Sequence, residues 1–153
     1  MPNQHVKGLA MEIKCPHCRQ RNRVPVEKLG QSVNCGKCHD PLLNAPVDVD
    51  AASLKELIAS SAVPVLVDFW APWCGPCRMF APTFKSAAGK FGGSVVFAKL
   101  DTEAHPSVGQ QFNIRSIPTL AAFLHGEELG RVSGALPAGE LEKLVLQLQA
   151  GKM

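Results

Sequence analysis

The chain has 153 residues, of which 46% are hydrophobic and 19% charged, and its formal net charge at pH 7 is +3. This composition supports a folded core and excludes an intrinsically disordered protein. The first residues lack the uninterrupted apolar stretch of a signal peptide, and no segment approaches the ~20 apolar residues of a membrane span. We therefore expect a cytoplasmic protein that does not associate with a membrane.

The first 46 residues contain two cysteine pairs with the same spacing, C-P-H-C at Cys15 and Cys18 and C-G-K-C at Cys35 and Cys38. Together the pairs read C-x2-C-x16-C-x2-C, which is typical of a zinc site with four thiolate ligands. We expect each pair to form a tight turn that presents two thiolates to one zinc ion. Because four protein ligands close a tetrahedral site, the predicted role of the zinc is structural.

Besides a redox-labile mixture of thiols and disulfides, two alternatives stay open for these cysteines. The first is a pair of disulfides, as in small secreted domains, although nothing in the sequence indicates secretion. The second is replacement of one thiolate by His17 or His39, which we interpret instead as solvated turn residues. The segment between the two pairs is long enough for a short hairpin but too short for a core, so the module needs its metal to fold.

Positive charge is concentrated in this N-terminal part, which holds seven Lys and Arg against three Asp and Glu. A small basic module can bind nucleic acid. However, the same residues include no Phe, Trp or Tyr that could stack on bases. Arg19, Arg21 and Arg23 alternate, so they can share one face of a strand. We interpret this face as the solvated side of a hairpin. We therefore expect no nucleic-acid partner.

The composition changes at about Val47, and strand and helix patterns alternate from there to the end of the chain. Ser53, with Glu56 three positions later, predicts a capping box at the first helix, and Pro82 predicts a kink in the second. The order β-α-β-α-β-α-β-β-α predicts an α/β domain with a mixed central sheet and helices on both faces. We predict strands over residues 47–50, 63–71, 94–101, 119–124 and 129–133, and helices over 53–61, 79–91, 107–112 and 140–148.

A third cysteine pair, C-G-P-C at Cys74 and Cys77, follows an apolar strand and opens a helix. A cysteine at a helix N-terminus meets free N–H groups and the positive end of the helix dipole, which favour its thiolate. Since the thiolate attacks in disulfide exchange, Cys74 is the predicted nucleophile and Cys77 the resolving cysteine. Gly75 and Pro76 form the turn between them, next to the substrate. The alternatives are a structural disulfide and half of a metal site.

Asp68 stands inside the apolar segment V-P-V-L-V-D-F-W-A. Burial should raise the pKa of its carboxyl group, which could then accept and donate a proton near neutral pH. The other interpretation is a buried acid paired with Lys99 of the next strand, and one residue could serve both purposes. Trp70, from the same segment, is expected to pack in the core.

Residues 47 to 150 resemble thioredoxin through W-C-G-P-C, through Asp68 six positions before Cys74, and through I-R-S-I-P-T at residues 114–119. With the four-cysteine extension, the whole chain resembles the zinc-containing class of bacterial thioredoxins. The resemblance implies a thioredoxin fold and a protein-disulfide reductase that holds no organic cofactor. It also implies disulfide-containing protein substrates and an NADPH-dependent thioredoxin reductase as partners, and we expect a monomer.

The same resemblance implies roles for individual residues. Asp68 takes the proton of the resolving cysteine through water, and Trp73 contacts the substrate. Pro118 is the cis-proline that faces the active pair, while Ile117 offers backbone hydrogen bonds to an extended substrate strand. Gly134 matches a third substrate-docking segment, with an ordinary turn glycine as the alternative.

The domain organisation predicted from these patterns has two parts. Residues 1–46 form a zinc-binding module with a flexible start, and residues 47–153 form the thioredoxin domain. Met11 is the more typical beginning for the zinc-containing class, so residues 1–10 are interpreted either as an extension or as an artefact of the assigned start site. A second function stays open for the module, because oxidation of its cysteines would release the metal and expose a surface for client binding.

Overall fold

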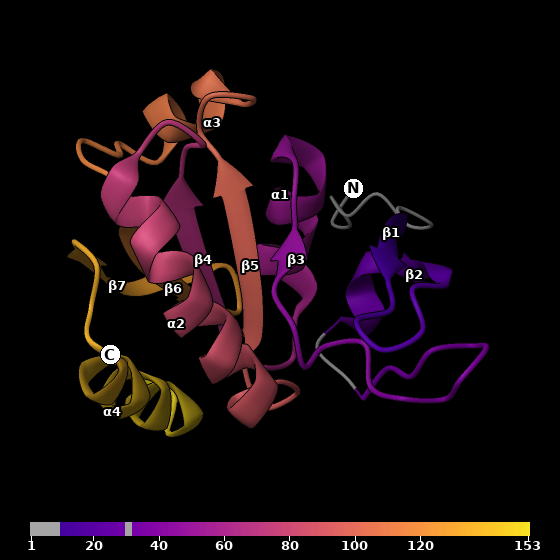
Figure 1. Cartoon of the computed structure of the whole chain (residues 1–153). Helices are drawn as coiled ribbons and strands as arrows, with labels where there is room; N and C mark the ends of the chain where they lie inside the picture. Colours follow the sequence, from indigo (N-terminus) through magenta and orange to yellow (C-terminus); the bar gives the residue numbers. More distant parts are fainter. Residues whose placement is uncertain (1–9, 30–31) are drawn as a thin grey trace.

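The computed structural model describes residues 10–29 and 32–153, which form a two-stranded sheet and a five-stranded sheet with helices (Figure 1). The flexible start and the extension predicted for residues 1–10 lie, except for Ala10, outside the described residues. The strands are β1 (Ala10–Lys14), β2 (Arg21–Pro25), β3 (Val47–Asp48), β4 (Val65–Trp70), β5 (Val96–Asp101), β6 (Thr119–Leu124) and β7 (Glu127–Ser133). The helices are η1 (Val26–Lys28), α1 (Ala51–Ser60), α2 (Gly75–Phe91), α3 (Pro106–Gln111) and α4 (Ala138–Gln149).

The small sheet is an antiparallel hairpin of β1 and β2 that closes around the first cysteine pair. The Cys15 amide donates to the Gln20 carbonyl at 2.9 Å, so the chain reverses at this turn. The hairpin therefore differs from the predicted one, because the partner of β2 precedes the first cysteine instead of following it. Arg19 lies in the turn with a φ of 68°, and only Arg21 and Arg23 share the strand.

The large sheet has the order β3-β5-β4-β6-β7. Strands β3, β4 and β5 run parallel to one another, whereas β6 is antiparallel to β4 and to β7. The predicted order of strands and helices and the mixed sheet are confirmed. Among the described residues, no helix combines the length and the apolar character that a membrane crossing requires.

Side chains alternate across β4 and separate two hydrophobic cores. Val65, Val67 and Phe69 belong to the core that also contains buried residues of α1 and α3. Leu66 belongs to the other core, with Phe80 of α2 and residues of α4. The predicted helices on both faces of the sheet are thus confirmed (Figure 1). The same alternation places Asp68 on the Leu66 side of β4, toward α2.

Helix α1 begins at Ala51, and its N-cap is Asp50. The Asp50 carboxylate accepts the Ser53 amide at 2.8 Å, and the Ser53 hydroxyl accepts the Asp50 amide at 3.0 Å. The predicted capping box between Ser53 and Glu56 is therefore wrong, and the box lies three residues earlier. Aspartate and serine are both good N-caps, so the sequence pattern alone fits either start of the helix.

The cysteine module packs on α1 and shares its core. Val26 of η1 and Leu29 are fully buried in the same cluster as Leu54 and Leu57 of α1. Figure 1 shows η1 and the small sheet beside α1, on the β3 side of the molecule. Helix α1 buries residues around most of its circumference, because the sheet covers one side and the module the other. The cysteine module and helix α1 therefore share one hydrophobic core.

The segment that leaves the module passes closely over the C-terminal end of α2. A Cβ atom added at Gly92 would overlap the Leu43 carbonyl oxygen and would lie 2.7 Å from the Asn44 Cα. These neighbours are backbone atoms, so they cannot move aside as a flexible side chain would. Gly89, one turn earlier on the same helix, leaves room, since a Cβ there would lie 3.7 Å from the Asn44 carbonyl oxygen.

Replacing Gly92 by Ala should lower the free energy of unfolding by about 2 kcal/mol, because the new methyl group overlaps backbone atoms of residues 43 and 44 and the Ala88 carbonyl oxygen of α2. The matched substitution Gly89→Ala should leave it unchanged or raise it by up to about 1 kcal/mol, because Ala favours the helix. Urea denaturation of both variants measures the difference. Equal stabilities of the two variants would show that this segment is not held against α2.

Candidate active site and metal centre

The cysteine pair Cys74 and Cys77 lies where β4 gives way to α2, and the two residues are joined by a disulfide. Cys74 is the N-cap of α2, and the Cys77 amide donates to the Cys74 sulfur at 3.2 Å. Both residues are nearly buried, with exposed fractions of 5% for Cys74 and 2% for Cys77. In the reduced protein the same N–H group would stabilise a Cys74 thiolate.

The residues predicted to contact the substrate surround this pair. The Ile117 carbonyl oxygen lies 3.8 Å from the Cys74 sulfur, and the peptide bond between Ile117 and Pro118 is cis, as predicted. The Gly134 amide donates to the Pro118 carbonyl at 2.8 Å, and the φ of Gly134 is +99°, which favours glycine. The chain thus brings residues 117–118 and Gly134 together beside the disulfide, although they are distant from it in sequence.

An exposed apolar surface adjoins the disulfide. Trp73 precedes Cys74 and has an exposed fraction of 65%. Met79, in the second turn of α2, is 80% exposed and is not among the predicted site residues. Its neighbour Phe80 is buried in the core, so the helical period of α2 could have marked Met79 as the outward residue.

Asp68 is fully buried, and neither of its carboxyl oxygens has a hydrogen-bond partner among the described residues. Burial raises the pKa of this carboxyl group from 3.8 to about 7, and the positive charge of Lys99 acts in the opposite direction. The Lys99 ammonium group lies 4.3 Å from the centroid of the Trp70 ring, in a cation–π contact. Asp68 can therefore change its protonation state close to neutral pH.

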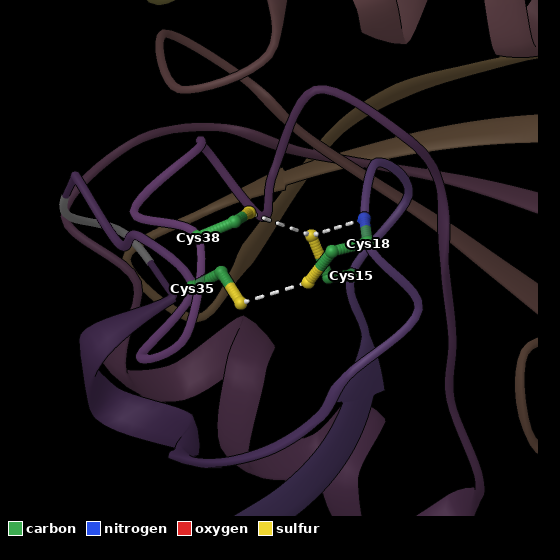
Figure 2. A group of neighbouring side chains, drawn as sticks. All are labelled: Cys15, Cys18, Cys35 and Cys38. Atoms are coloured by element: carbon green, nitrogen blue, oxygen red, sulfur yellow. Dashed lines mark hydrogen bonds between the residues drawn. The ribbon is translucent and has the colours of Figure 1, made fainter.

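The other four cysteines converge into one cluster (Figure 2). Their sulfur atoms all lie within 4.8 Å of one another, and the distances from Cys15 to Cys38 and from Cys18 to Cys35 are both 3.6 Å. Zinc–sulfur bonds of about 2.3 Å place the sulfurs of a tetrahedral site roughly 3.8 Å apart. The four thiols are free rather than paired in disulfides. The donor set and its spacing thus fit a tetrahedral metal ion.

Backbone N–H groups point at the sulfurs of this cluster. The Cys18 and His17 amides lie 3.4 Å from the Cys15 sulfur, and the Lys37 amide lies 3.3 Å from the Cys35 sulfur. The Cys18 amide lowers the pKa of Cys15, and the Cys38 amide lowers that of Cys35 to about 6. At Cys38 the Asp40 amide lowers the pKa, but burial and the other three sulfurs raise it to about 12. The turns therefore favour thiolates, the form that binds a metal, at Cys15 and Cys35.

The two histidines next to the cluster lie outside it. The His17 Nδ1 atom is 3.4 Å from the Asp40 carboxylate, and its side chain is 70% exposed. His39 is a turn residue with a φ of 69°. In the part of the chain that the structure describes, the candidate metal ligands are the four cysteines alone.

Two family models match separate parts of the chain. The family model described as "Thioredoxin" matches residues 45–147, and the model "Thioredoxin 2, N-terminal" matches residues 14–40. The chain belongs to the thioredoxin family. Within this family it falls in the thioredoxin 2 class, which has an N-terminal zinc ribbon. The pair Cys74–Cys77 is its thiol-disulfide active site, and the chain is a protein-disulfide reductase.

Several relatives support this assignment. Thioredoxin C-3 of Corynebacterium nephridii is 47% identical over 145 residues, which cover 92% of this chain and 99% of that protein. The crystal structure of Malassezia sympodialis thioredoxin is 30% identical, with a TM-score of 0.62 over 69% of this chain and 92% of that one. The structure of a mutant thioredoxin from Halobacterium salinarum is 28% identical, with a TM-score of 0.64 over 70% of this chain and 93% of its own. The thioredoxin fold predicted from the sequence is confirmed.

The raised pKa of Asp68 predicts how stability depends on pH. Between about pH 4 and pH 7 the unfolded chain has lost this proton while the folded chain keeps it. The stability contributed by Asp68 is therefore complete below pH 4 and is lost as the pH rises through 7. From pH 4 to pH 8, the wild-type oxidised protein should lose roughly 3 to 4 kcal/mol of unfolding free energy relative to Asp68→Asn.

The measurement is urea denaturation of both proteins across this pH range. Asp48→Asn, at an exposed position of β3, is the matched control and should keep the wild-type pH dependence. Parallel stability curves for the wild type and Asp68→Asn would show that the Asp68 carboxyl group titrates at its ordinary pKa.

Proposed function

We propose that this thioredoxin reduces disulfides of client proteins in the cytoplasm, with Cys74 as the nucleophile and Cys77 as the resolving cysteine. The observation that carries the assignment is the N-cap position of Cys74, whose sulfur accepts the Cys77 N–H group. Only the first of the two cysteines holds this position, so only its thiolate gains the free N–H groups of the helix. The disulfide in the structure represents the oxidised product.

The reaction consists of two exchanges. The Cys74 thiolate attacks one sulfur of the client disulfide, forms a mixed disulfide and expels the other client sulfur as a thiolate, which takes up a proton. Cys77 then loses its proton and attacks the Cys74 sulfur, which releases the second client thiolate. The client gains two electrons and two protons, and the Cys74–Cys77 pair becomes a disulfide.

Asp68 is the proposed acceptor of the Cys77 proton, acting through water. Its side chain lies on the face of β4 that α2 covers, and Cys77 is in the first turn of α2. A carboxyl group with a pKa of about 7 can take a proton from a thiol and return it later at neutral pH. Lys99 contributes a positive charge that moderates this pKa.

The client is proposed to dock along the edge formed by Ile117, Pro118 and Gly134. The Ile117 carbonyl oxygen beside the Cys74 sulfur can accept a backbone hydrogen bond from an extended client segment. Pro118, Gly75 and Pro76 contribute contacts around the pair, and Trp73 offers an exposed apolar surface. Displacing water from such a surface favours association with an apolar client segment.

The four cysteines Cys15, Cys18, Cys35 and Cys38 are proposed to hold one zinc ion, which stabilises the module when bound, and we propose no organic cofactor. The fit of the cluster to a tetrahedral ion supports this assignment.

We propose the domain division at residues 1–46 and 47–153, which the ranges of the two family models support. An NADPH-dependent thioredoxin reductase is the proposed source of electrons, and the proposed state of the protein is a monomer without a nucleic-acid partner.

A second function, redox sensing by the zinc module, is favoured by one observation. Val26 and Leu29 of the module share a core with α1, so loosening of the module would expose apolar side chains of both. Oxidation of the zinc cysteines would have this effect. Client binding triggered by peroxide, and preserved in a variant without Cys74 and Cys77, would support this function.

Substitution of the active pair should separate the two cysteine roles. Cys77→Ser should accumulate a mixed disulfide with a client such as insulin, because Cys74 can attack but nothing resolves the product. Cys74→Ser should form no adduct, and neither variant should sustain insulin reduction by dithiothreitol above background. Mass spectrometry detects the adduct, and insulin turbidity reports the turnover. An adduct with Cys74→Ser alone would reverse the assignment.

The zinc assignment predicts one zinc ion per chain in the wild type and in the double variant Cys74→Ser/Cys77→Ser. Cys35→Ser should lose most of the zinc, since a site with three thiolates binds more weakly. Zinc released by a mercurial reagent and measured with a coloured chelator gives the stoichiometry. Metal-free protein whose four N-terminal cysteines resist alkylation would instead establish a pair of disulfides.

A further inference from the structure

A polar cavity of about 390 Å³ lies beside the proposed docking edge. All of its lining side chains are polar, with two guanidinium groups, one amide and three hydroxyl groups. They are Asn113, Arg115, Ser116, Thr119, Arg131 and Ser133. Its composition contrasts with the apolar surface that Trp73 presents next to the disulfide.

The cavity and the docking edge are formed by the same two segments of chain. Ser116 directly precedes Ile117, and Ser133 directly precedes Gly134. Thr119 and Ser133 lie opposite each other in the ladder of β6 and β7, and their hydroxyl oxygens are 3.4 Å apart. A client segment that docks at Ile117 and Gly134 would therefore place a nearby side chain at this cavity.

The charges around the cavity do not cancel. Arg131 is held by Glu128 through two hydrogen bonds, of 2.7 and 2.8 Å, which offset its positive charge. Arg115 is exposed, and in the described part of the chain no ion pair joins it to an acidic side chain. The cavity thus has an excess of one positive charge, and Arg115 supplies it.

Arg115 is well placed to meet a ligand. It also lines a second cavity, of about 240 Å³, together with Ser116 and Ile117, so its side chain borders both hollows beside the docking edge. The Thr119 hydroxyl is engaged, because it donates to the Ser116 carbonyl at 2.6 Å. The guanidinium group of Arg115 is therefore the charged donor of this cavity that has no acidic partner among the described residues.

We propose that this cavity binds the carboxylate of an aspartate or glutamate two or three residues from the client's cysteine, and that Arg115 is its main contact. A guanidinium group matches a carboxylate through two parallel hydrogen bonds. An extended segment advances about 3.3 to 3.6 Å per residue, so a side chain two or three positions from the client's cysteine lies roughly 7 to 11 Å further along the segment. The inference rests on the proposed docking edge and defines a preferred client class, disulfides with acidic neighbours.

The test uses disulfide peptides that differ only in the residue two positions from the attacked cysteine, which is Asp, Asn or Lys. The wild type should reduce the Asp peptide with a kcat/KM about three- to fivefold above that of the Asn peptide, and the Lys peptide most slowly. Arg115→Gln should bring the Asp to Asn ratio close to one, and Arg115→Glu should invert it. Added salt should weaken the preference in the wild type.

The matched control is Lys85→Gln, which removes an exposed positive charge of α2 outside this cavity and should keep the wild-type ratio. Equal kcat/KM values for the Asp and Asn peptides in the wild type would overturn the inference and leave the reductase function intact. A preference that persists in Arg115→Gln would also overturn it. Failure to reduce any of the peptides would instead contradict the proposed docking and the reductase mechanism.

Discussion

The hydrogen bond from the Cys77 N–H group to the Cys74 sulfur is the interaction on which the chemistry depends. It exists because β4 ends at Trp70 and α2 begins at Gly75, so the first cysteine becomes the N-cap. A helix start has unpaired N–H groups, and a sulfur placed there is stabilised as a thiolate. The rest of the fold supplies this helix with a fixed support, namely the core formed by Phe80, Phe84 and α4.

The buried acid and the exposed apolar surface differ in their access to solvent, and each has a distinct physical effect. Asp68 lies in the sheet beneath α2, where burial brings its pKa close to neutral. Trp73 and Met79 remain in contact with solvent and can cover an apolar client segment. Burial of the acid prevents direct contact with the client, so the proposed proton transfer and the proposed client recognition involve separate groups.

Most of the fold could be predicted because β4, β5 and β6 are short apolar runs and the motifs are local. The four zinc cysteines and the Cys74–Cys77 pair follow from spacing alone. The sequence pattern did not reveal the N-cap at Asp50, since Ser53 satisfies the same local preference and only tertiary packing decides between them. It also did not reveal the cavity at Arg115 and Arg131, because strand pairing between β6 and β7 brings these residues together.

The shared core between η1 and α1 has a consequence for the evolution of this class. Helix α1 is covered by the sheet on one side and by the module on the other, so Leu29 and the α1 positions near it cannot vary independently. A lineage that lost the module would need polar substitutions on the uncovered side of α1 to remain soluble. Substitutions in the two segments should therefore be correlated among homologues that keep the zinc ribbon, as at a permanent subunit interface.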